Sequence, residues 1–160
     1  DDGEYVRVVG LGMNVTELLE NTALRGAVVQ DLNRLPTLPF ADDSFDACLI
    51  SFSIQYLTQP VRVLADVARV LQPGGAFYVA YTNRMFPTKA VAVWQACSDV
   101  ERGQLIGGYL AIAQQATGSP CRVSWTSACP SPTSYCISRI AWPSGVDDSM
   151  LPLTPAHLPL

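Results

Sequence analysis

Short apolar runs alternate with amphipathic stretches along the first two-thirds of the chain. Four runs have the length and β-branched or aromatic content typical of strands. These runs are residues 5–11 (YVRVVGL), 27–32 (AVVQDL), 47–52 (ACLISF) and 76–81 (AFYVAY). The run at 47–52 is apolar at nearly every position, which predicts a strand that is covered on both faces of a parallel sheet.

The stretches between these runs predict helices. They are residues 15–20, 60–71, 87–97 and 101–114. Asn14 precedes the first of them as a candidate N-cap, and Pro60 fits the first turn of the second. Residues 73–75 (PGG) then stop that helix and turn the chain. Strands separated by helices predict an α/β fold with a doubly wound, mostly parallel sheet.

The composition changes near Thr117. Residues 117–160 hold seven of the twelve prolines and four charged residues, and no strand or helix period persists there. Such a segment buries too little apolar surface to offset its ordering entropy. We therefore expect an α/β domain over residues 1–116 and an irregular or disordered tail over residues 117–160.

The bulk properties exclude some classes of function. The 160 residues suffice for one ordinary domain, and the net charge of −4 disfavours nucleic acid as a partner. No apolar run reaches the ~18–20 residues of a membrane span. The five cysteines have no CxxC spacing and there is one histidine, so we expect no metal site and a reducing, cytoplasmic location. The acidic start without methionine resembles a cut end rather than a signal peptide, so a location in an organelle remains an alternative.

One weak motif follows the first predicted strand. Gly10-Leu-Gly12 is similar to the start of a dinucleotide-binding loop, and Asp31 lies about 20 residues on. Val15 stands where the fingerprint has its third glycine. An NAD(P)-binding oxidoreductase therefore remains one alternative, beside glycines that merely close a turn.

A linked set of motifs is more specific. Asp31 follows the second strand, and residues 38–46 (LPFADDSFD) lead into the third. The helix at 60–71 then ends in residues 71–75 (LQPGG), which lead into the fourth strand. This combination, at this spacing, resembles the class I S-adenosylmethionine-dependent methyltransferases of the type 11-like group. The resemblance runs from about residue 5 to 113, and residues 83–89 (NRMFPTK) are also similar to a subgroup of these enzymes.

The resemblance implies a Rossmann-like sheet, S-adenosylmethionine as methyl donor and a small-molecule methyl acceptor. A carboxylate just beyond a parallel strand can accept a hydrogen bond from an exocyclic amine at the ligand-binding edge of the sheet. Asp31 and the Leu32 backbone would meet the adenine, whereas Ser51 and Phe52 would line the space between donor and acceptor. No general base stands out, and methyl transfer can depend largely on positioning. The implied cofactor-binding residues are Gly12, Met13, Asp31, Leu32, Ser51 and Phe52.

The chain also departs from the family pattern. The first visible strand corresponds to the family's second, so the first strand and its glycine-rich loop are missing. Gly12 and Met13 stand where the family has an acidic residue for the ribose. The remaining strands would either close up in the order 2-1-3-4 or leave an open gap with two exposed inner edges. The fragment is therefore either an active methyltransferase or a non-catalytic relative or truncated product.

Overall fold

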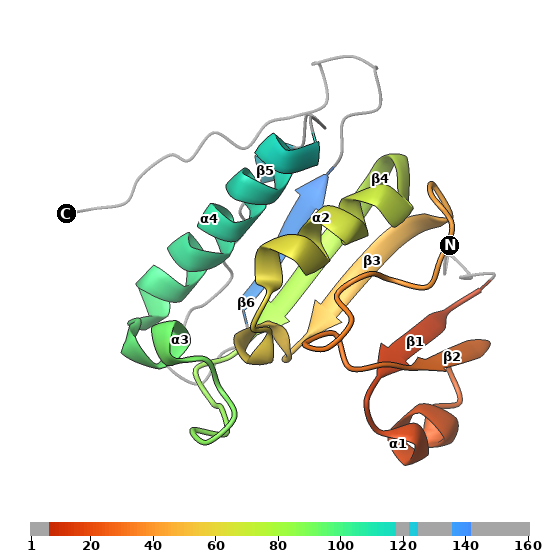
Figure 1. The fold of residues 1–160 in the computed structure, drawn as a ribbon, viewed down its shortest axis with the longest axis horizontal. Coiled ribbons are helices and arrows are strands. Elements are labelled where there is room, and N and C mark those ends of the chain that lie inside the picture. The colour runs from red at the N-terminus through yellow and green to blue at the C-terminus, as the bar shows by residue number, and fades with distance from the viewer. Residues whose placement is uncertain (1–6, 118–121, 125–135, 142–160) are drawn as a thin grey trace.

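The structure, a computed structural model, describes residues 7–117, 122–124 and 136–141 as an α/β fold (Figure 1). Strands β1 (Val9–Gly12) and β2 (Gly26–Val29) pair in parallel and are joined by helix α1 (Val15–Glu20). Strands β3 (Phe45–Ser51) and β4 (Leu71–Tyr81) form a second parallel pair. The parallel α/β architecture predicted from the sequence is confirmed, as two small sheets.

The second pair is extended by helices on one side and antiparallel strands at its edge. The short 3-10 helix η1 (Ile54–Tyr56) and helix α2 (Pro60–Val70) connect β3 to β4. Helices α3 (Ala92–Ala96) and α4 (Asp99–Thr117) follow. Strand β6 (Cys136–Ala141) pairs antiparallel with β4, and β5 (Arg122–Ser124) pairs antiparallel with β6.

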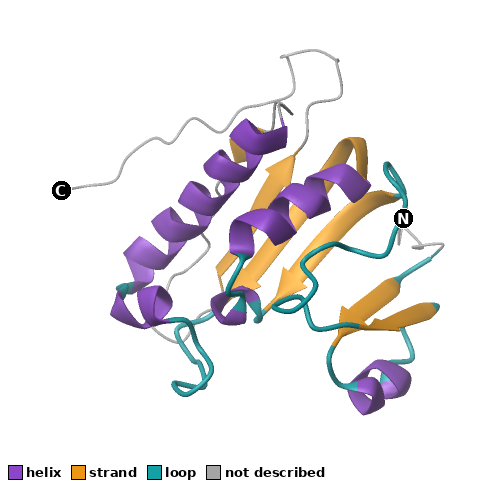
Figure 2. Cartoon of the chain, in the orientation of Figure 1, coloured by secondary structure: helices purple, strands orange, loops and turns teal. Residues whose placement is uncertain are grey.

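The two parallel pairs do not join into one sheet. Within the described residues the hydrogen-bonded order is β1-β2 in one sheet and β3-β4-β6-β5 in the other. The closed order 2-1-3-4 is therefore wrong, and the gap stays open between β1 and β3 (Figure 1). The connection over residues 30–44 is bonded to η1 and α2, so it crosses the gap without drawing the strands together (Figure 2).

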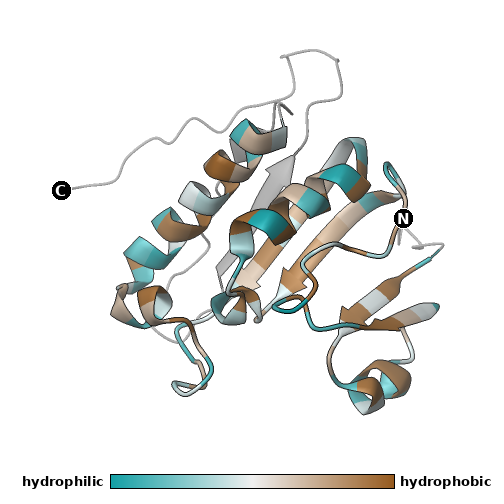
Figure 3. Ribbon diagram, viewed as in Figure 1, coloured by the Kyte–Doolittle hydropathy of each residue, from teal (hydrophilic) through white to brown (hydrophobic). Residues whose placement is uncertain are grey.

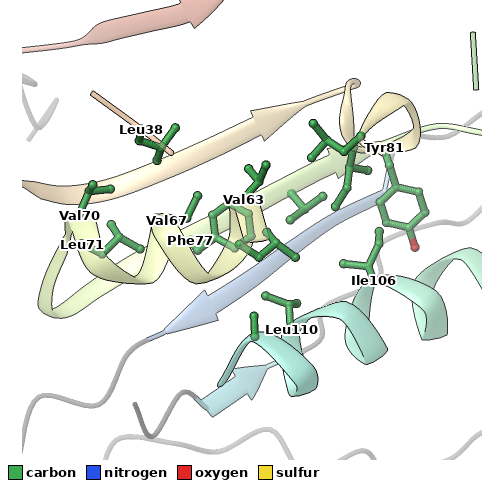
Figure 4. Packing of buried hydrophobic residues seen from close by; sticks show 14 of the residues in the cluster. Leu38, Val63, Val67, Val70, Leu71, Phe77, Tyr81, Ile106 and Leu110 are labelled. Atoms are coloured by element: carbon green, nitrogen blue, oxygen red, sulfur yellow. The ribbon is translucent and has the colours of Figure 1, made fainter. Parts of the chain in front are cut away.

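The core lies between the four-stranded sheet and two helices. Phe77 and Val79 on β4 are fully buried, and they pack with residues of α2 and α4 (Figure 4). Cys48 and Ile50 on β3, which pair with Phe77 and Val79, pack against the same cluster. Burial raises the pKa of the Cys48 thiol to about 11, because the thiolate would lose hydration, although a hydrogen bond from the Leu49 backbone opposes this effect.

The opposite face of β3 is uncovered. The Leu49 side chain is 61% exposed, and Ala47 and Ser51 are exposed on the same side of the strand. The prediction of a strand covered on both faces is therefore wrong, because a continuous apolar run reports hydrophobicity and not what lies above each face. Apolar side chains are also exposed around β1, α1 and β2, including Met13, Leu19 and Val29 (Figure 3).

The PGG segment lies inside β4, whereas the sequence predicted it as a turn before this strand. Helix α2 ends at Val70, and the pairing register of β3 with β4 shifts between Phe45 and Ala47, opposite residues 71–76. Gly74 has φ 84°, and a Cβ on Gly75 would lie 2.8 Å from the Gln72 carbonyl oxygen. Only glycine fits both positions without displacing the backbone.

Helix α3 is shorter than the helix predicted over residues 87–97. The Gln95 amide donates to the carbonyl oxygens of Pro87 and Ala90, and Lys89 N–H bonds back to Phe86 O in a turn. These hydrogen bonds fix a loop where the sequence pattern indicated helix. Helix α4 instead begins earlier than predicted, where Ser98 and Glu101 form a reciprocal capping box.

The tail also differs from its prediction. Residues 122–124 and 136–141 form strands, so the irregular tail is corrected at these positions. Pairing on the edge of β4 uses backbone groups, which need no periodic side-chain pattern. The other residues beyond Thr117 lie outside the described residues, and the domain boundary near residue 116 stays a prediction. None of the helices in the described ranges has the length and apolar character of a membrane span.

A matched pair of leucines tests this distribution of the core. Leu64 on α2 is 1% exposed and Leu49 is 61% exposed. We expect Leu64→Ala to lower the free energy of unfolding by about 2–5 kcal/mol, because it leaves a cavity. Leu49→Ala should change it by less than about 0.5 kcal/mol. Urea denaturation followed by circular dichroism measures both, and equal losses would show that β3 is covered on its second face.

Candidate functional site

The parallel strands end together at one edge of the molecule. The arrowheads of β1 and β3 point the same way in Figure 1, and each strand's parallel partner ends beside it. Ligands of open α/β sheets bind at this carboxyl edge, where loops diverge from the strand ends. The structure brings all the sequence-predicted site residues to this edge, namely Gly12, Met13, Asp31, Leu32, Ser51 and Phe52.

A series of hydrogen bonds connects the loops along this edge. The Gln30 N–H donates to Gly12 O at 3.0 Å and joins the ends of β1 and β2. The Asn33 amide donates to Tyr56 O at 2.9 Å and joins the loop after β2 to η1. The Phe86 N–H donates to the Tyr56 hydroxyl at 3.1 Å and joins η1 to the loop after β4. The loops that follow β1, β2, β3 and β4 are thus connected to one another by hydrogen bonds. We call these connected loops the rim.

Asp31 heads the loop after β2. Its Oδ1 accepts from the Asn33 N–H at 2.9 Å, and its carbonyl oxygen accepts from Arg34 and Leu35. This turn uses one of the two carboxylate oxygens and holds the half-buried side chain beside the ends of β1 and β2. A carboxylate in this position suits a ligand that donates hydrogen bonds.

Asn33 is the main residue that the sequence reasoning missed. Besides its bond to Tyr56, its Oδ1 accepts from the Thr58 N–H at 2.7 Å, and its carbonyl oxygen accepts from the Gln59 amide at 3.1 Å. It therefore fixes the Asp31 loop against the start of α2. Its partners lie 23–26 residues away, so no local pattern could have revealed them.

Phe52 ends the strand in an unusual conformation. Its φ is 49°, in the left-handed region that costs a non-glycine residue roughly 1–2 kcal/mol. The Phe52 N–H donates to Ala80 O at 2.8 Å, and its carbonyl oxygen accepts from the Gln55 amide at 3.0 Å. These two bonds hold the chain reversal at Ser51 and Phe52, so the backbone turns sharply at the carboxyl end of β3.

Gln55 contributes a further polar group beside Phe52. Its side chain is 1% exposed, and its Oε1 has no hydrogen-bond partner among the described residues. A buried acceptor of this kind costs about 1–3 kcal/mol unless a donor reaches it. The rim therefore carries two acceptors, on Asp31 and Gln55, that suit amine or hydroxyl donors.

Arg69 on α2 binds the LPFADDSFD motif (residues 38–46) by hydrogen bonds. The guanidinium donates to both carboxylate oxygens of Asp66 at 2.7 and 2.9 Å, to the Leu38 and Phe40 carbonyl oxygens at 3.0 and 2.9 Å, and to Asp42 at 2.7 Å. Asp66 also accepts from the Leu38 N–H. We call this set of residues the Arg69 clamp.

The apolar residues of the same motif pack inward. The rings of Phe40 and Phe45 meet edge to face, with centroids 4.9 Å apart, and both contact the core. The motif is therefore structural: it anchors the connection that leads from the Asp31 loop into β3.

The clamp also determines the charge state of Asp66. Burial raises the pKa of this carboxyl, but the hydrogen bonds from Arg69 and the Leu38 N–H outweigh that effect and leave the pKa below its usual value. A lowered folded-state pKa stabilises the fold above the unfolded-state pKa of about 3.9. This stability is lost as the pH falls through the folded-state pKa.

Asp66→Asn tests the clamp. The variant keeps the size of the side chain but removes its charge, so at pH 7 we expect a loss of about 1–3 kcal/mol in the free energy of unfolding. From pH 6 to pH 3 the wild type should lose more stability than the variant. Urea denaturation at each pH measures the difference, and identical pH profiles would contradict the assigned role of Asp66.

The glycines of the weak dinucleotide motif have another role. Gly10 and Gly12 lie within β1 rather than in a loop after it. A Cβ on Gly10 would come within 2.5 Å of a Leu24 methyl group and 3.0 Å of Leu18. Gly10 therefore lets α1 and the following turn pack closely on the strand, which explains the motif without a dinucleotide.

The sequence of the chain matches a known family. Residues 5–79 match the family described as a methyltransferase domain. The demethylmenaquinone methyltransferase of Renibacterium salmoninarum is 51% identical over 43 residues, which are 27% of this chain and 18% of that protein. The ubiquinone/menaquinone biosynthesis C-methyltransferase UbiE of Paracoccus denitrificans is 50% identical over 48 residues, which are 30% and 19% of the two chains. The chain thus spans about a fifth of the length of these curated relatives.

Solved structures show the same fold. The S-adenosylmethionine-dependent methyltransferase from Mesorhizobium loti superposes with a TM-score of 0.54 at 16% identity, covering 84% of this chain and 80% of that one. The methyltransferase from Aquifex aeolicus gives a TM-score of 0.50 at 17% identity, covering 84% and 68%. Residues 5–79 thus match the methyltransferase domain family, and the chain shares the Rossmann-like α/β architecture of these solved structures.

Proposed function

We propose that this chain binds S-adenosylmethionine at the carboxyl edge and serves methyl transfer to a small-molecule acceptor. The observation that carries the proposal is the connected rim, which places the Asp31 carboxylate, the Phe52 reversal and the Tyr56–Phe86 contact along one edge. The match of residues 5–79 to the methyltransferase domain family supports the same reaction class. Several relatives are named as quinone-biosynthesis methyltransferases, which supports a small acceptor for this chain as well.

The hydrogen-bond acceptors of the rim suit the adenosine part of this cofactor. Asp31 would accept from the adenine amino group, with the Leu32 backbone beside it. Gly12 and Met13 would lie along the ribose, and Ser51 and Phe52 along the space between donor and acceptor. Gln55 Oε1, which is buried without a partner in the described part of the chain, offers a further acceptor for a bound donor group.

The residues of the chain act by positioning. When bound, S-adenosylmethionine would supply an activated sulfonium methyl group, and transfer of this group to the acceptor would release S-adenosylhomocysteine and the proton of the acceptor. The hydrogen-bonded loops would hold the two reactants in line, and the buried apolar side chains of Ile54 and Leu57 would keep water from one side of the rim. Proximity and orientation of this kind can account for much of the rate of a reaction whose methyl group is already activated.

Asp31→Asn tests the cofactor site. The amide keeps the Oδ1 acceptor that the Asn33 turn uses, but it removes the negative charge. We expect the affinity for S-adenosylhomocysteine to fall about tenfold or more, because a hydrogen bond to a charged group contributes about 1.5–3 kcal/mol. Isothermal titration calorimetry measures the affinity, and circular dichroism should show an unchanged fold.

Asp43→Asn is the matched control. Asp43 is exposed at the opposite, amino end of β3, and its φ of 52° suits asparagine as well as aspartate. The affinity of the Asp43→Asn variant for S-adenosylhomocysteine should equal that of the wild type. Equal affinities for all three proteins would remove Asp31 from the site, and no binding to the wild type would refute the proposed function. Binding without methyl transfer would identify a non-catalytic relative.

A further inference from the structure

The loop between β4 and α3, residues 82–91, carries chemistry that the cofactor site does not use. It emerges at the carboxyl edge and stands beside η1 (Figure 1). The Phe86 N–H donates to the Tyr56 hydroxyl, and the Val91 N–H donates to Gln55 O at 3.0 Å. The loop is thus attached at two points to the residues that follow Ser51 and Phe52.

Its backbone is fixed by its own hydrogen bonds. The N–H groups of Lys89 and Ala90 donate to Phe86 O at 2.9 and 3.0 Å. The Gln95 amide donates to Pro87 O at 3.0 Å and to Ala90 O at 2.7 Å. A surface held in this way loses little conformational entropy when a ligand binds.

The exposed side chains of the loop are aromatic and cationic. Phe86 is 67% exposed, and the Lys89 ammonium lies 5.5 Å from the centre of its ring. Arg84 is exposed on the same loop, and residues 82–91 contain no acidic residue although the chain has a net charge of −4. The Tyr56 ring lies 6.5 Å from the Phe86 ring at a tilt of 34°, so a second aromatic face adjoins the first.

An exposed aromatic ring beside two cations suits one kind of small molecule. A flat ring can pack on Phe86, and an oxyanion attached to it can bind Arg84 and Lys89 by charge-assisted hydrogen bonds. Two cations on one short loop are too few for a nucleic-acid backbone, which needs an extended basic face. We propose that residues 82–91 select the methyl acceptor. This acceptor is an aromatic molecule that bears an oxyanion, either a carboxylate or a phosphate. This inference depends on the proposed function, because it names the acceptor class of the same site.

Three probe molecules separate the contribution of the aromatic ring to binding from that of the negative charge. The chain is saturated with S-adenosylhomocysteine and titrated by calorimetry with 1-naphthoate, 1-naphthyl phosphate and neutral 1-naphthamide. We expect at least one anionic probe to bind about tenfold more tightly than the amide. The preference between carboxylate and phosphate then identifies the source of the oxyanion. Equal binding of all three, or binding of none, overturns the proposal.

Variants assign the preference to the loop. Arg84→Gln combined with Lys89→Gln should abolish the preference for the anion, and Phe86→Ala should weaken all three probes several-fold. Arg25→Gln, an exposed arginine that precedes β2 at the amino edge, is the matched control and should leave the preference unchanged. An equal loss in the control would show a general charge effect and overturn the assignment to this loop.

The affinity for S-adenosylhomocysteine distinguishes failure of the inference from failure of the proposed function. It should be the same in the wild type and in the Arg84→Gln, Lys89→Gln double variant. If the double variant loses it, the two cations bind the cofactor rather than the acceptor, and the inference is wrong while the function stands. If the wild type does not bind S-adenosylhomocysteine, the function is wrong, and the probes titrated alone still report whether the loop selects an anionic ring.

Discussion

The Arg69 clamp is the interaction on which the arrangement of the chain depends. One guanidinium bonds to Asp66 and Asp42 and to the Leu38 and Phe40 carbonyl oxygens, so it joins α2 to a segment 27–31 residues away. A planar guanidinium with several donors suits this task, which a lysine with its single point charge would not fulfil. Because the clamped segment leads directly into β3, the clamp determines where this strand begins.

Helix α2 transmits this constraint to the opposite edge. Near its C-terminal end, the carbonyl oxygens of Arg69 and Val70 accept from Asp43 and Ser44 just before β3. At its other end, Thr58 and Gln59 bond to Asn33 beside Asp31. A buried face with Val63 and Leu64 fixes the helix on the sheet. Helix α2 is therefore bonded at one end to the start of β3 and at the other end to the rim. Because the helix is packed on the sheet, the core determines the position of the Asn33 loop in the rim.

Local patterns predicted what local physics determines. The limits of α1 and the Asn14 cap are confirmed, because Asn14 Oδ1 accepts from Thr16 and Glu17 within one turn. The start of α2 at Pro60 follows from proline chemistry in the same way. The sequence could not show the uncovered face of Leu49, the pairing of β6 on β4 or the bonds of Asn33, because each depends on residues far away along the chain. The position of Asp31 was predictable from the strand pattern, whereas the turn that orients it was not.

The open gap divides the carboxyl edge into halves that differ in burial. No residue of β1, α1 or β2 is fully buried, whereas β4, α2 and α4 share one core. Gly12 and Asp31 therefore stand on the half with the smaller free energy of opening, and Phe52 and Phe86 on the half with the larger. A ligand that contacts both halves favours their closed arrangement in proportion to its affinity for it. Within the described residues, Asn33 bridges the halves by its hydrogen bonds with Tyr56, Thr58 and Gln59, and Leu11 of β1 also packs against the core. A ligand that contacts both halves would add to this set of bridging contacts.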